Sequence, residues 1–179
     1  MRVITGTAGG MRLQTLDGES TRPTTEKVKE AIFSSIQFDI EGKRVLDLFS
    51  GSGQMGIEAL SRGAKSCVFV DKERAAASVI KNNLEKTRLS NSAKVVQSDA
   101  VSFLDRQIEV FDLVFLDPPY SCGLLEKALA KVYMNMSNGA ILFAEHPVND
   151  ILPDEIGQLK KIKDYRYGKI AVTRYEVRR

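Results

Sequence analysis

Apolar and polar residues along the chain follow two periods, which predict strands alternating with helices. Five short apolar runs have the length of strands: RVLDLF (44–49), SCVFVD (66–71), AKVVQSD (93–99), FDLVFLD (111–117) and GAILFAEH (139–146). Segments with apolar residues at helical spacing follow the first four runs, at 54–63, 73–87, 101–106 and 123–136. Because such strands are joined by right-handed crossovers, this order predicts a parallel sheet with helices on both faces.

Both ends of the chain depart from this rhythm. Residues 1–16 turn at Ala8-Gly9-Gly10, which predicts a small β-hairpin, and residues 159–177 predict a second hairpin. The segment after Pro23 repeats apolar residues at helical spacing: Val28, Ile32, Phe33 and Ile36. We therefore expect an α/β fold: a doubly wound, mostly parallel sheet of seven strands. An antiparallel C-terminal hairpin completes it, and a small N-terminal extension of hairpin plus helix precedes it.

Composition suits one ordinary globular domain. The 179 residues are 43% apolar and 27% charged, with a net charge of only +3. We expect a single domain made of an extension (1–40) and a core (41–179). No apolar run is long enough to span a bilayer and the N-terminus lacks the apolar core of a signal peptide, so we expect a cytoplasmic protein. We also expect a monomer, although nothing in the sequence fixes the oligomeric state.

Metal and thiol chemistry are not expected. Cys67 and Cys122 lie far apart without metal spacing, and the single histidine, His146, makes a zinc site improbable. We expect the two cysteines to be packing or surface thiols and His146 to have a surface role.

Residues 51–56, GSGQMG, fit the G-x-G-x-x-G dinucleotide fingerprint, which alone is a weak signal. Two adenosine-containing cofactors are compatible with it: a nicotinamide dinucleotide and S-adenosylmethionine (SAM). Gly51 and Gly53 let the backbone approach a ligand closely. Asp71, 20 residues after Gly51, suits ribose hydroxyls in either cofactor.

Acidic residues at four strand ends favour SAM. Asp47, Asp71, Asp99 and Asp117 each end a predicted parallel strand, where open sheets bind ligands. A carboxylate at Asp47 would repel a pyrophosphate but suits the α-ammonium of SAM. Asp99 can accept from the adenine amine while the Ala100 N–H faces a ring nitrogen. Each acid taken alone could equally be a helix N-cap.

The strongest signal is VFLDPPY, 114–120. Two prolines after a buried strand form a rigid loop that projects Asp117, the Pro118 carbonyl and Tyr120. Two acceptors aimed at the N–H bonds of a nucleobase amine would localise its lone pair and stabilise the charge that develops during methyl transfer. Tyr120 offers a face on which a flipped base can stack.

The chain resembles the bacterial family that methylates the N2 amine of a guanine in 16S ribosomal RNA. The shared blocks are MRVITGTAGGMRL, TRPTTEKVKEAIFSSI, LDLFSGSGQMGIEALSRGA, VDKERAA, KNNL, FDLVFLDPPY and RYGKIAVTRYE. The resemblance implies the SAM-dependent methyltransferase sheet. It implies a SAM site at Asp47, Phe49, Gly51, Gly53, Asp71 and Asp99, to which we add Lys72 and Ala100. It also implies a target-amine site at Asp117, Pro118, Pro119 and Tyr120. The family usually has Arg-Glu where this chain has Lys29-Glu30, which puts a bidentate contact there in doubt.

The expected partner is 16S ribosomal RNA or a small-subunit assembly, and S-adenosyl-L-homocysteine is the expected product. Arg2, Arg12 and Arg22 lie on the extension and its exit, where they could meet phosphates, and the extension would be superfluous for binding SAM. Three other readings stay open: an N6-adenine methyltransferase on DNA or RNA, a dehydrogenase, and a non-enzymatic RNA-binding module.

Overall fold

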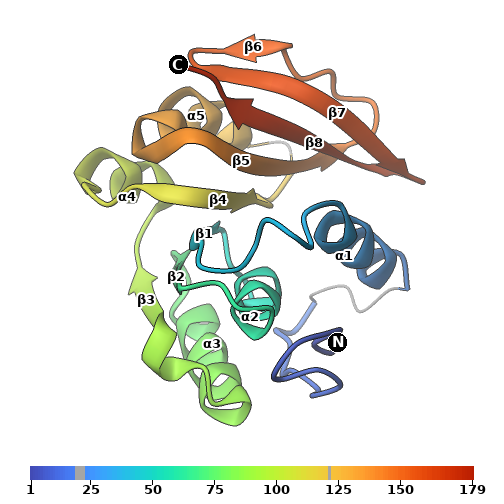
Figure 1. The fold of residues 1–179 in the computed structure, drawn as a ribbon, viewed down its shortest axis with the longest axis vertical. Helices are drawn as coiled ribbons and strands as arrows, with labels where there is room; N and C mark the ends of the chain where they lie inside the picture. The colour runs from blue at the N-terminus through green and yellow to red at the C-terminus, as the bar shows by residue number, and fades with distance from the viewer. Residues whose placement is uncertain (19–22, 121) are drawn as a thin grey trace.

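The computed structural model describes residues 1–18, 23–120 and 122–179 (Figure 1). Its elements in chain order are α1 (Pro23–Ser35), β1 (Arg44–Leu48), α2 (Gln54–Ser61), β2 (Ser66–Asp71), α3 (Arg74–Thr87), β3 (Ala93–Gln97), α4 (Ala100–Arg106), β4 (Phe111–Leu116), α5 (Leu124–Val132), β5 (Met136–Pro147), β6 (Glu155–Ile156), β7 (Leu159–Tyr167) and β8 (Ile170–Val177). Two single-turn 3₁₀ helices cover Ser90–Ser92 and Tyr133–Asn135.

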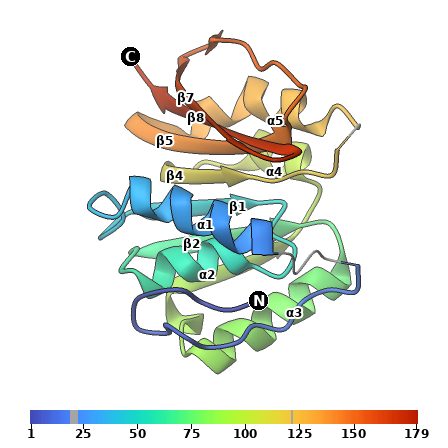
Figure 2. The ribbon, with the colours of Figure 1, turned by 90° about the vertical axis from the view of Figure 1, so that its right-hand side faces the viewer.

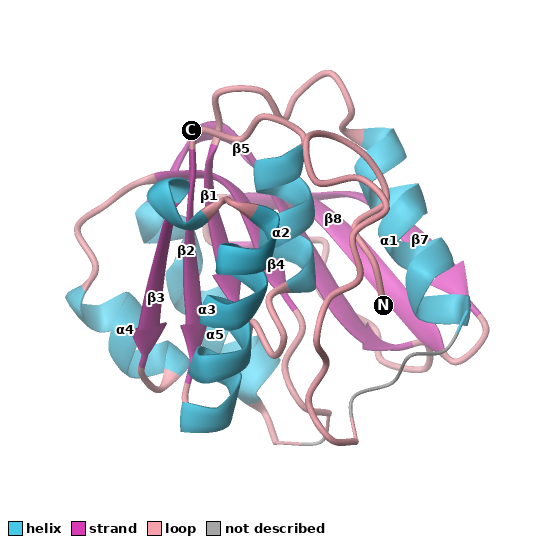
Figure 3. Cartoon of the chain, turned by 90° about the horizontal axis from the view of Figure 1, so that it is seen from below, coloured by secondary structure: helices cyan, strands magenta, loops and turns pink. Residues whose placement is uncertain are grey.

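The strands form one sheet in the order β3-β2-β1-β4-β5-β8-β7-β6. Strands β1 to β5 are parallel, and β8, β7 and β6 add antiparallel pairs at one side. Helices α1, α2 and α3 cover one face, and α4 and α5 cover the other (Figures 2 and 3). The predicted doubly wound sheet is confirmed. Its seven expected strands are joined by an eighth, the two-residue β6.

Burial explains why these segments became strands and helices. In β4, Leu113 and Phe115 pack on the side of α1, while Val114 and Leu116 pack on the side of α5, so a continuous apolar run fills both cores. The helical stripe predicted after Pro23 is confirmed: Val28, Ile32, Phe33 and Ile36 are all buried.

Helix α5 is shorter than the predicted 123–136, and β5 is longer than expected. The helix ends at Val132, a single 3₁₀ turn follows, and β5 already begins at Met136. Met136 is fully buried and pairs with Phe111 of β4, so a tertiary contact sets the boundary that the apolar spacing alone placed later.

The N-terminal hairpin is reduced to a loop closed by a single bridge. Arg2 and Arg12 form an isolated antiparallel bridge, and the Val3 N–H donates to the Met11 carbonyl at 2.9 Å. No strand is present in residues 1–18. Val3 and Leu13 are buried against the α1 side of the core, so the segment is held by packing rather than by a β-ladder.

Glu58 of α2 fastens this segment to the core. Its two carboxylate oxygens accept from the Ile4 N–H at 2.7 Å, the Thr5 N–H at 3.1 Å and Arg62 Nε at 2.8 Å. The buried Lys29 ammonium lies 3.7 Å from the same carboxylate and donates to the Arg2 carbonyl at 2.6 Å. Burial lowers the pKa of Lys29, and the Glu58 charge opposes that effect. Lys29 thus has a structural role inside the protein, and its side chain does not reach the surface.

His146 is buried at 3% exposure, so the expectation of a surface role was wrong. Its ring nitrogens contact Thr173 Oγ1 of β8 at 2.8 Å and the Pro147 carbonyl at 2.9 Å. Strand β8, near the C-terminus, pairs with β5 and covers His146. A contact between segments so far apart in the sequence cannot be predicted from the local pattern of apolar residues. Within the described ranges, no helix has both the length and the apolar character that a bilayer span requires.

Candidate active site

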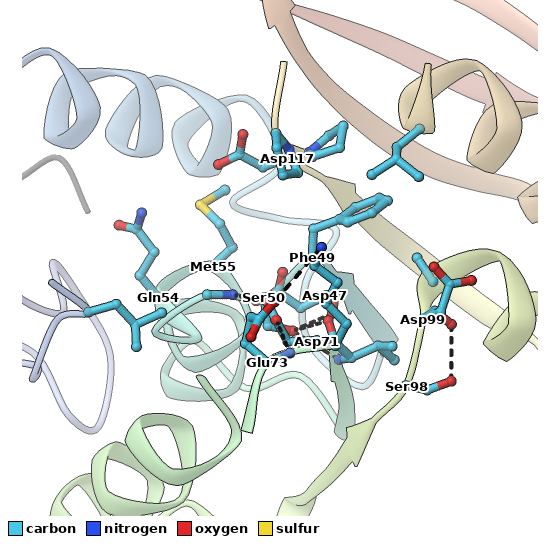
Figure 4. Close-up of a pocket in the computed structure, with 18 of the residues that line it drawn as sticks. Asp47, Phe49, Ser50, Gln54, Met55, Asp71, Glu73, Ser98, Asp99 and Asp117 are labelled. Atoms are coloured by element: carbon cyan, nitrogen blue, oxygen red, sulfur yellow. Dashed lines mark hydrogen bonds and ion pairs between the residues drawn. The ribbon is translucent and has the colours of Figure 1, made fainter. Parts of the chain in front are cut away.

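A cavity of about 630 Å³ opens at the carboxyl ends of β1, β2, β3 and β4 (Figure 4). The strand order reverses here, with β2 on one side of β1 and β4 on the other, which is where doubly wound sheets bind ligands. All predicted cofactor and catalytic residues line the cavity except Gly53. Four separate strand ends therefore converge on one site, as the acidic pattern predicted.

The glycine loop between β1 and α2 needs unusual backbone angles. Phe49, Gly51 and Gly53 have φ values of 69°, 54° and 80°, in the left-handed region that favours glycine. Gly53 forms the N-cap of α2 behind the cavity wall. At Gly56, an added Cβ would lie 2.3 Å from the Phe69 ring, so this glycine lets α2 pack closely on β2.

Asp47 and Asp71 hold this loop in place as well as line the cavity. Asp47 Oδ2 accepts from the Gly56 N–H at 2.9 Å. Asp71 accepts from the Gly51 N–H at 3.0 Å and from the Glu73 N–H at 2.9 Å. Both carboxylates are thereby fixed in orientation before any ligand arrives, which lowers the entropic cost of binding.

Asp99 combines the two roles weighed from the sequence. Its Oδ1 accepts from the Ser102 N–H at 2.9 Å and caps α4, and this hydrogen bond lowers the pKa of Asp99. The cap holds the side chain at the far wall of the cavity, with Ala100 beside it. Capping and cavity lining thus occur in the same residue.

The cavity is strongly acidic. Among the described residues that line it, Lys72 is the one basic side chain, against six acidic ones: Asp17, Asp47, Asp71, Glu73, Asp99 and Asp117. A diphosphate would be repelled there, whereas a ligand bearing an ammonium and a sulfonium would be attracted. The donor and acceptor set therefore fits SAM and fits a dinucleotide poorly.

The DPPY loop forms the wall nearest α1 and α5. Pro118 is buried, whereas Asp117, Pro119 and Tyr120 are exposed toward the cavity mouth. The Cys122 thiol lies 3.1 Å from the Pro119 carbonyl and donates to the loop backbone. Cys122 thus ties the backbone of the loop at its far end.

Tyr120 is anchored by a residue that the sequence did not indicate. Its hydroxyl donates to Glu145 Oε1 of β5 at 2.9 Å. Burial raises the pKa of the Tyr120 phenol, and the nearby Glu145 and Asp117 carboxylates raise it further. The phenol therefore stays protonated and acts as a donor.

The N-terminal extension forms part of the cavity, which corrects the expectation that it would be superfluous there. Leu16, Asp17 and Gly18 line the cavity together with the glycine loop and the DPPY loop. The Gln14 N–H donates to Asn83 Oδ1 at 2.8 Å, and Asn83 Nδ2 donates back to the Gln14 carbonyl. Helix α3 thereby clips the extension beside the glycine loop. The segment from Gln14 to Gly18 is irregular backbone, so the periodicity of apolar residues could not predict its contact with α3 or its place in the cavity wall.

Of the predicted RNA-contact arginines, Arg2 and Arg12 are both exposed on the N-terminal loop. Arg22 lies outside the described residues. The buried Val3 and Leu13 alternate with them, so one short segment caps the core and presents two guanidinium groups to solvent. In the ranges that the structure describes, no group of three or more His, Cys, Asp or Glu side chains is arranged to hold a metal ion.

Comparison with known proteins covers almost the whole chain. A Bacillus subtilis (strain 168) protein named "Putative rRNA methyltransferase YlbH" is 40% identical, over 99% of this chain and 100% of that protein. The "Ribosomal RNA small subunit methyltransferase D" of Escherichia coli (strain K12) is 33% identical, over 98% of this chain and 89% of that protein.

A solved structure shares the fold. The "Putative methyltransferase yhhF from Escherichia coli" superimposes with a TM-score of 0.91 at 30% identity, covering 99% of this chain and 98% of that one. The sheet is therefore that of the class I SAM-dependent methyltransferases. The family model described as "Conserved hypothetical protein 95" matches residues 1–176, and the chain belongs to this family.

Proposed function

We propose that this protein transfers a methyl group from SAM to the exocyclic N2 amine of a guanine in 16S ribosomal RNA. The observation that carries the proposal is the DPPY loop at the mouth of an acidic cavity built for a cationic cofactor. The relatives at 40% and 33% identity bear names of ribosomal RNA methyltransferases, which supports the substrate class. A monomeric protein acting in the cytoplasm stays part of the same prediction.

SAM supplies an electrophilic methyl group when it is bound. The protein's side chains would position the cofactor and the target base. Asp71 would hold the ribose hydroxyls, Asp47 the α-ammonium, and Asp99 with Ala100 the adenine. Backbone N–H groups already orient Asp47, Asp71 and Asp99, so these carboxylates would bind the methyl donor with little reorganisation.

The target amine would donate its two N–H bonds to Asp117 and the Pro118 carbonyl. These acceptors favour a pyramidal nitrogen with a localised lone pair and stabilise the positive charge that grows during attack. As the nitrogen–methyl bond forms and the sulfur–methyl bond breaks, S-adenosyl-L-homocysteine leaves. The surplus proton on nitrogen passes to Asp117 or water.

The experiment that tests the function is mass mapping of 16S ribosomal RNA from cells with and without this protein. A nucleoside digest separates N2-methylguanosine from N6-methyladenosine, the product of the main alternative. Loss of one N2-methylguanosine supports the proposal. Loss of an N6-methyladenosine instead would assign the chain to the adenine enzymes.

The Asp71→Ala variant should weaken SAM binding by about 1–3 kcal/mol, the cost of losing a charged hydrogen-bond partner. Asp71→Asn keeps an acceptor for the Gly51 N–H and should lose less. Isothermal titration calorimetry with SAM measures both, and thermal unfolding checks that each variant folds. Unchanged affinity of Asp71→Ala would remove Asp71 from the cofactor site.

The Arg2→Ala, Arg12→Ala double variant should keep its SAM affinity but bind RNA less tightly. It should also show a salt dependence shallower by roughly one to two units of slope, because each phosphate contact contributes about 0.7–0.9. Fluorescence anisotropy with a 16S RNA fragment at several salt concentrations measures this. The matched control removes Lys94 of β3 and Lys127 of α5, two exposed cations outside the N-terminal loop. Wild-type affinity and slope would place the RNA surface elsewhere.

A further inference from the structure

Glu145 lies beside the catalytic Asp117 on the neighbouring strand. Strands β4 and β5 pair in parallel with Leu116 opposite Ala144, so the next residues along, Asp117 and Glu145, are neighbours at the carboxyl edge. Both line a second, smaller cavity of about 30 Å³ between α1 and the sheet. Three residues line both cavities: Gln54, Met55 and Asp117. The small cavity therefore adjoins the large one beside Asp117, where the target amine is proposed to bind.

The Glu145 side chain is half-buried and has a single hydrogen-bond partner among the described residues. Within the described chain, the Tyr120 hydroxyl is the one group that hydrogen-bonds it, at 2.9 Å. Burial raises the pKa of Glu145, and the Tyr120 hydrogen bond opposes this. By contrast, Asp112 of β4 accepts from Arg44 and from Ser137, which saturate it. An ionised carboxylate can accept about four hydrogen bonds, so Glu145, with one, has capacity for a donor on a ligand.

Two adjacent acceptor-only groups match one purine edge. Guanine presents N1–H next to its N2 amine, so neighbouring donors lie along its Watson–Crick edge. Adenine presents an amine donor next to N1, which is an acceptor and would face a carboxylate lone pair unfavourably.

We propose that Glu145 accepts the N1–H of the target guanine while Asp117 and the Pro118 carbonyl hold its N2 amine, so that Glu145 selects the base. This assignment rests on the proposed guanine-N2 function and adds the residue that reads guanine. Tyr120 acts on Glu145 as a positioning residue. Its hydroxyl donates to Oε1 and fixes the carboxylate, so Oε2 can accept the N1–H of the base.

The test compares guanine with 2-aminopurine, which keeps the C2 amine but has a lone pair at N1. Once mass mapping has located the modified guanine, 16S RNA is rebuilt by ligation around a synthetic segment carrying either base there. Single-turnover rates at saturating SAM give the ratio of guanine to 2-aminopurine. The wild type should prefer guanine by about 10- to 100-fold, since a buried acceptor without its donor is costly.

Glu145→Gln should reduce that ratio about tenfold, because its amide can donate to the N1 lone pair of 2-aminopurine. The missing O6 of 2-aminopurine affects both enzymes alike and cancels in the comparison. Tyr120→Phe should slow both substrates and largely keep the ratio. Glu85→Gln, an exposed glutamate of α3, is the matched control and should keep the wild-type ratio.

Equal rates of the wild type on both bases would overturn the role of Glu145, whatever the variants do. An equal loss by Glu145→Gln on both bases would also overturn it and reduce Glu145 to a support for Tyr120. If Glu145→Gln does not fold, Glu145→Asp replaces it, and it should keep the preference for guanine at a lower rate; loss of the preference would contradict the proposal. If the wild type does not methylate the N2 amine of any guanine, the proposed function itself is refuted. That outcome is therefore distinct from failure of the role proposed for Glu145.

Discussion

Replacing Asp117 by alanine should slow methyl transfer by about 100- to 1,000-fold while SAM affinity stays within a fewfold of the wild type. Removing one preorganised hydrogen-bonding group from a transition state has costs of this size. Asp117 lies at the end of β4, on the wall nearest α1, whereas the carboxylates assigned to SAM lie at the ends of β1, β2 and β3. On the proposed role, its loss should act on the acceptor amine and leave the cofactor contacts in place.

Single-turnover methylation of 16S RNA measures the rate, and calorimetry measures SAM binding. Asp117→Asn keeps one acceptor oxygen and should lose less activity than Asp117→Ala. Asp39→Ala, at an exposed position after α1, is the matched control and should be indistinguishable from the wild type. If Asp117→Ala retained turnover within a fewfold, Asp117 would not hold the target amine.

The sheet and the strand-end acids were predictable because both depend on local pattern. An apolar run such as 111–116 has to be buried on both faces, which only a central parallel strand achieves. Once the strands are parallel, their carboxyl ends meet at one edge, so Asp47, Asp71, Asp99 and Asp117 converge without further information. The doubly wound sheet follows from the same alternation, whereas the class I methyltransferase fold was implied by the family resemblance; both are confirmed.

The residues that sequence reasoning missed depend on partners distant along the chain. Glu145 is one of several polar residues in β5, and it is linked to the site by its hydrogen bond with Tyr120, 25 positions away along the chain. His146 is buried because Thr173 of the last strand covers it. Leu16 and Asp17 reach the cavity through irregular backbone, which has no period to detect. The spacing of apolar residues in α2 also does not show that Glu58 is buried, because an acidic residue in a helix is usually exposed.

Replacing Glu58 by alanine should lower the free energy of unfolding by about 3–5 kcal/mol, the cost of breaking a buried ion pair from one side. Glu58 is fully buried and Lys29 is 1% exposed, so the variant leaves an ammonium in the interior without its counter-charge. It also leaves the Ile4 and Thr5 N–H groups without their acceptor. For a chain of this size, the melting temperature should fall by roughly 6–20 °C.

Urea unfolding measures the loss, and a double-mutant cycle identifies its cause. Lys29→Met removes the buried charge together with its need for a partner and should cost clearly less than Glu58→Ala. The Lys29→Met, Glu58→Ala double variant should lose less than the sum of these two single changes. Additive losses, or a loss below about 1 kcal/mol for Glu58→Ala, would mean that the pair does not hold the segment.

Loss of the Glu58 anchor should also reach the cofactor. The segment fastened at Ile4 and Thr5 continues to Leu16 and Asp17 in the cavity wall, so its release should expose residues 1–18 to limited proteolysis and weaken SAM binding. Saturating SAM should then slow cleavage, because a ligand that binds the closed wall stabilises it. Cleavage of Glu58→Ala at the wild-type rate, with SAM affinity unchanged, would separate the anchor from the site and leave Glu58 as a stabilising residue alone.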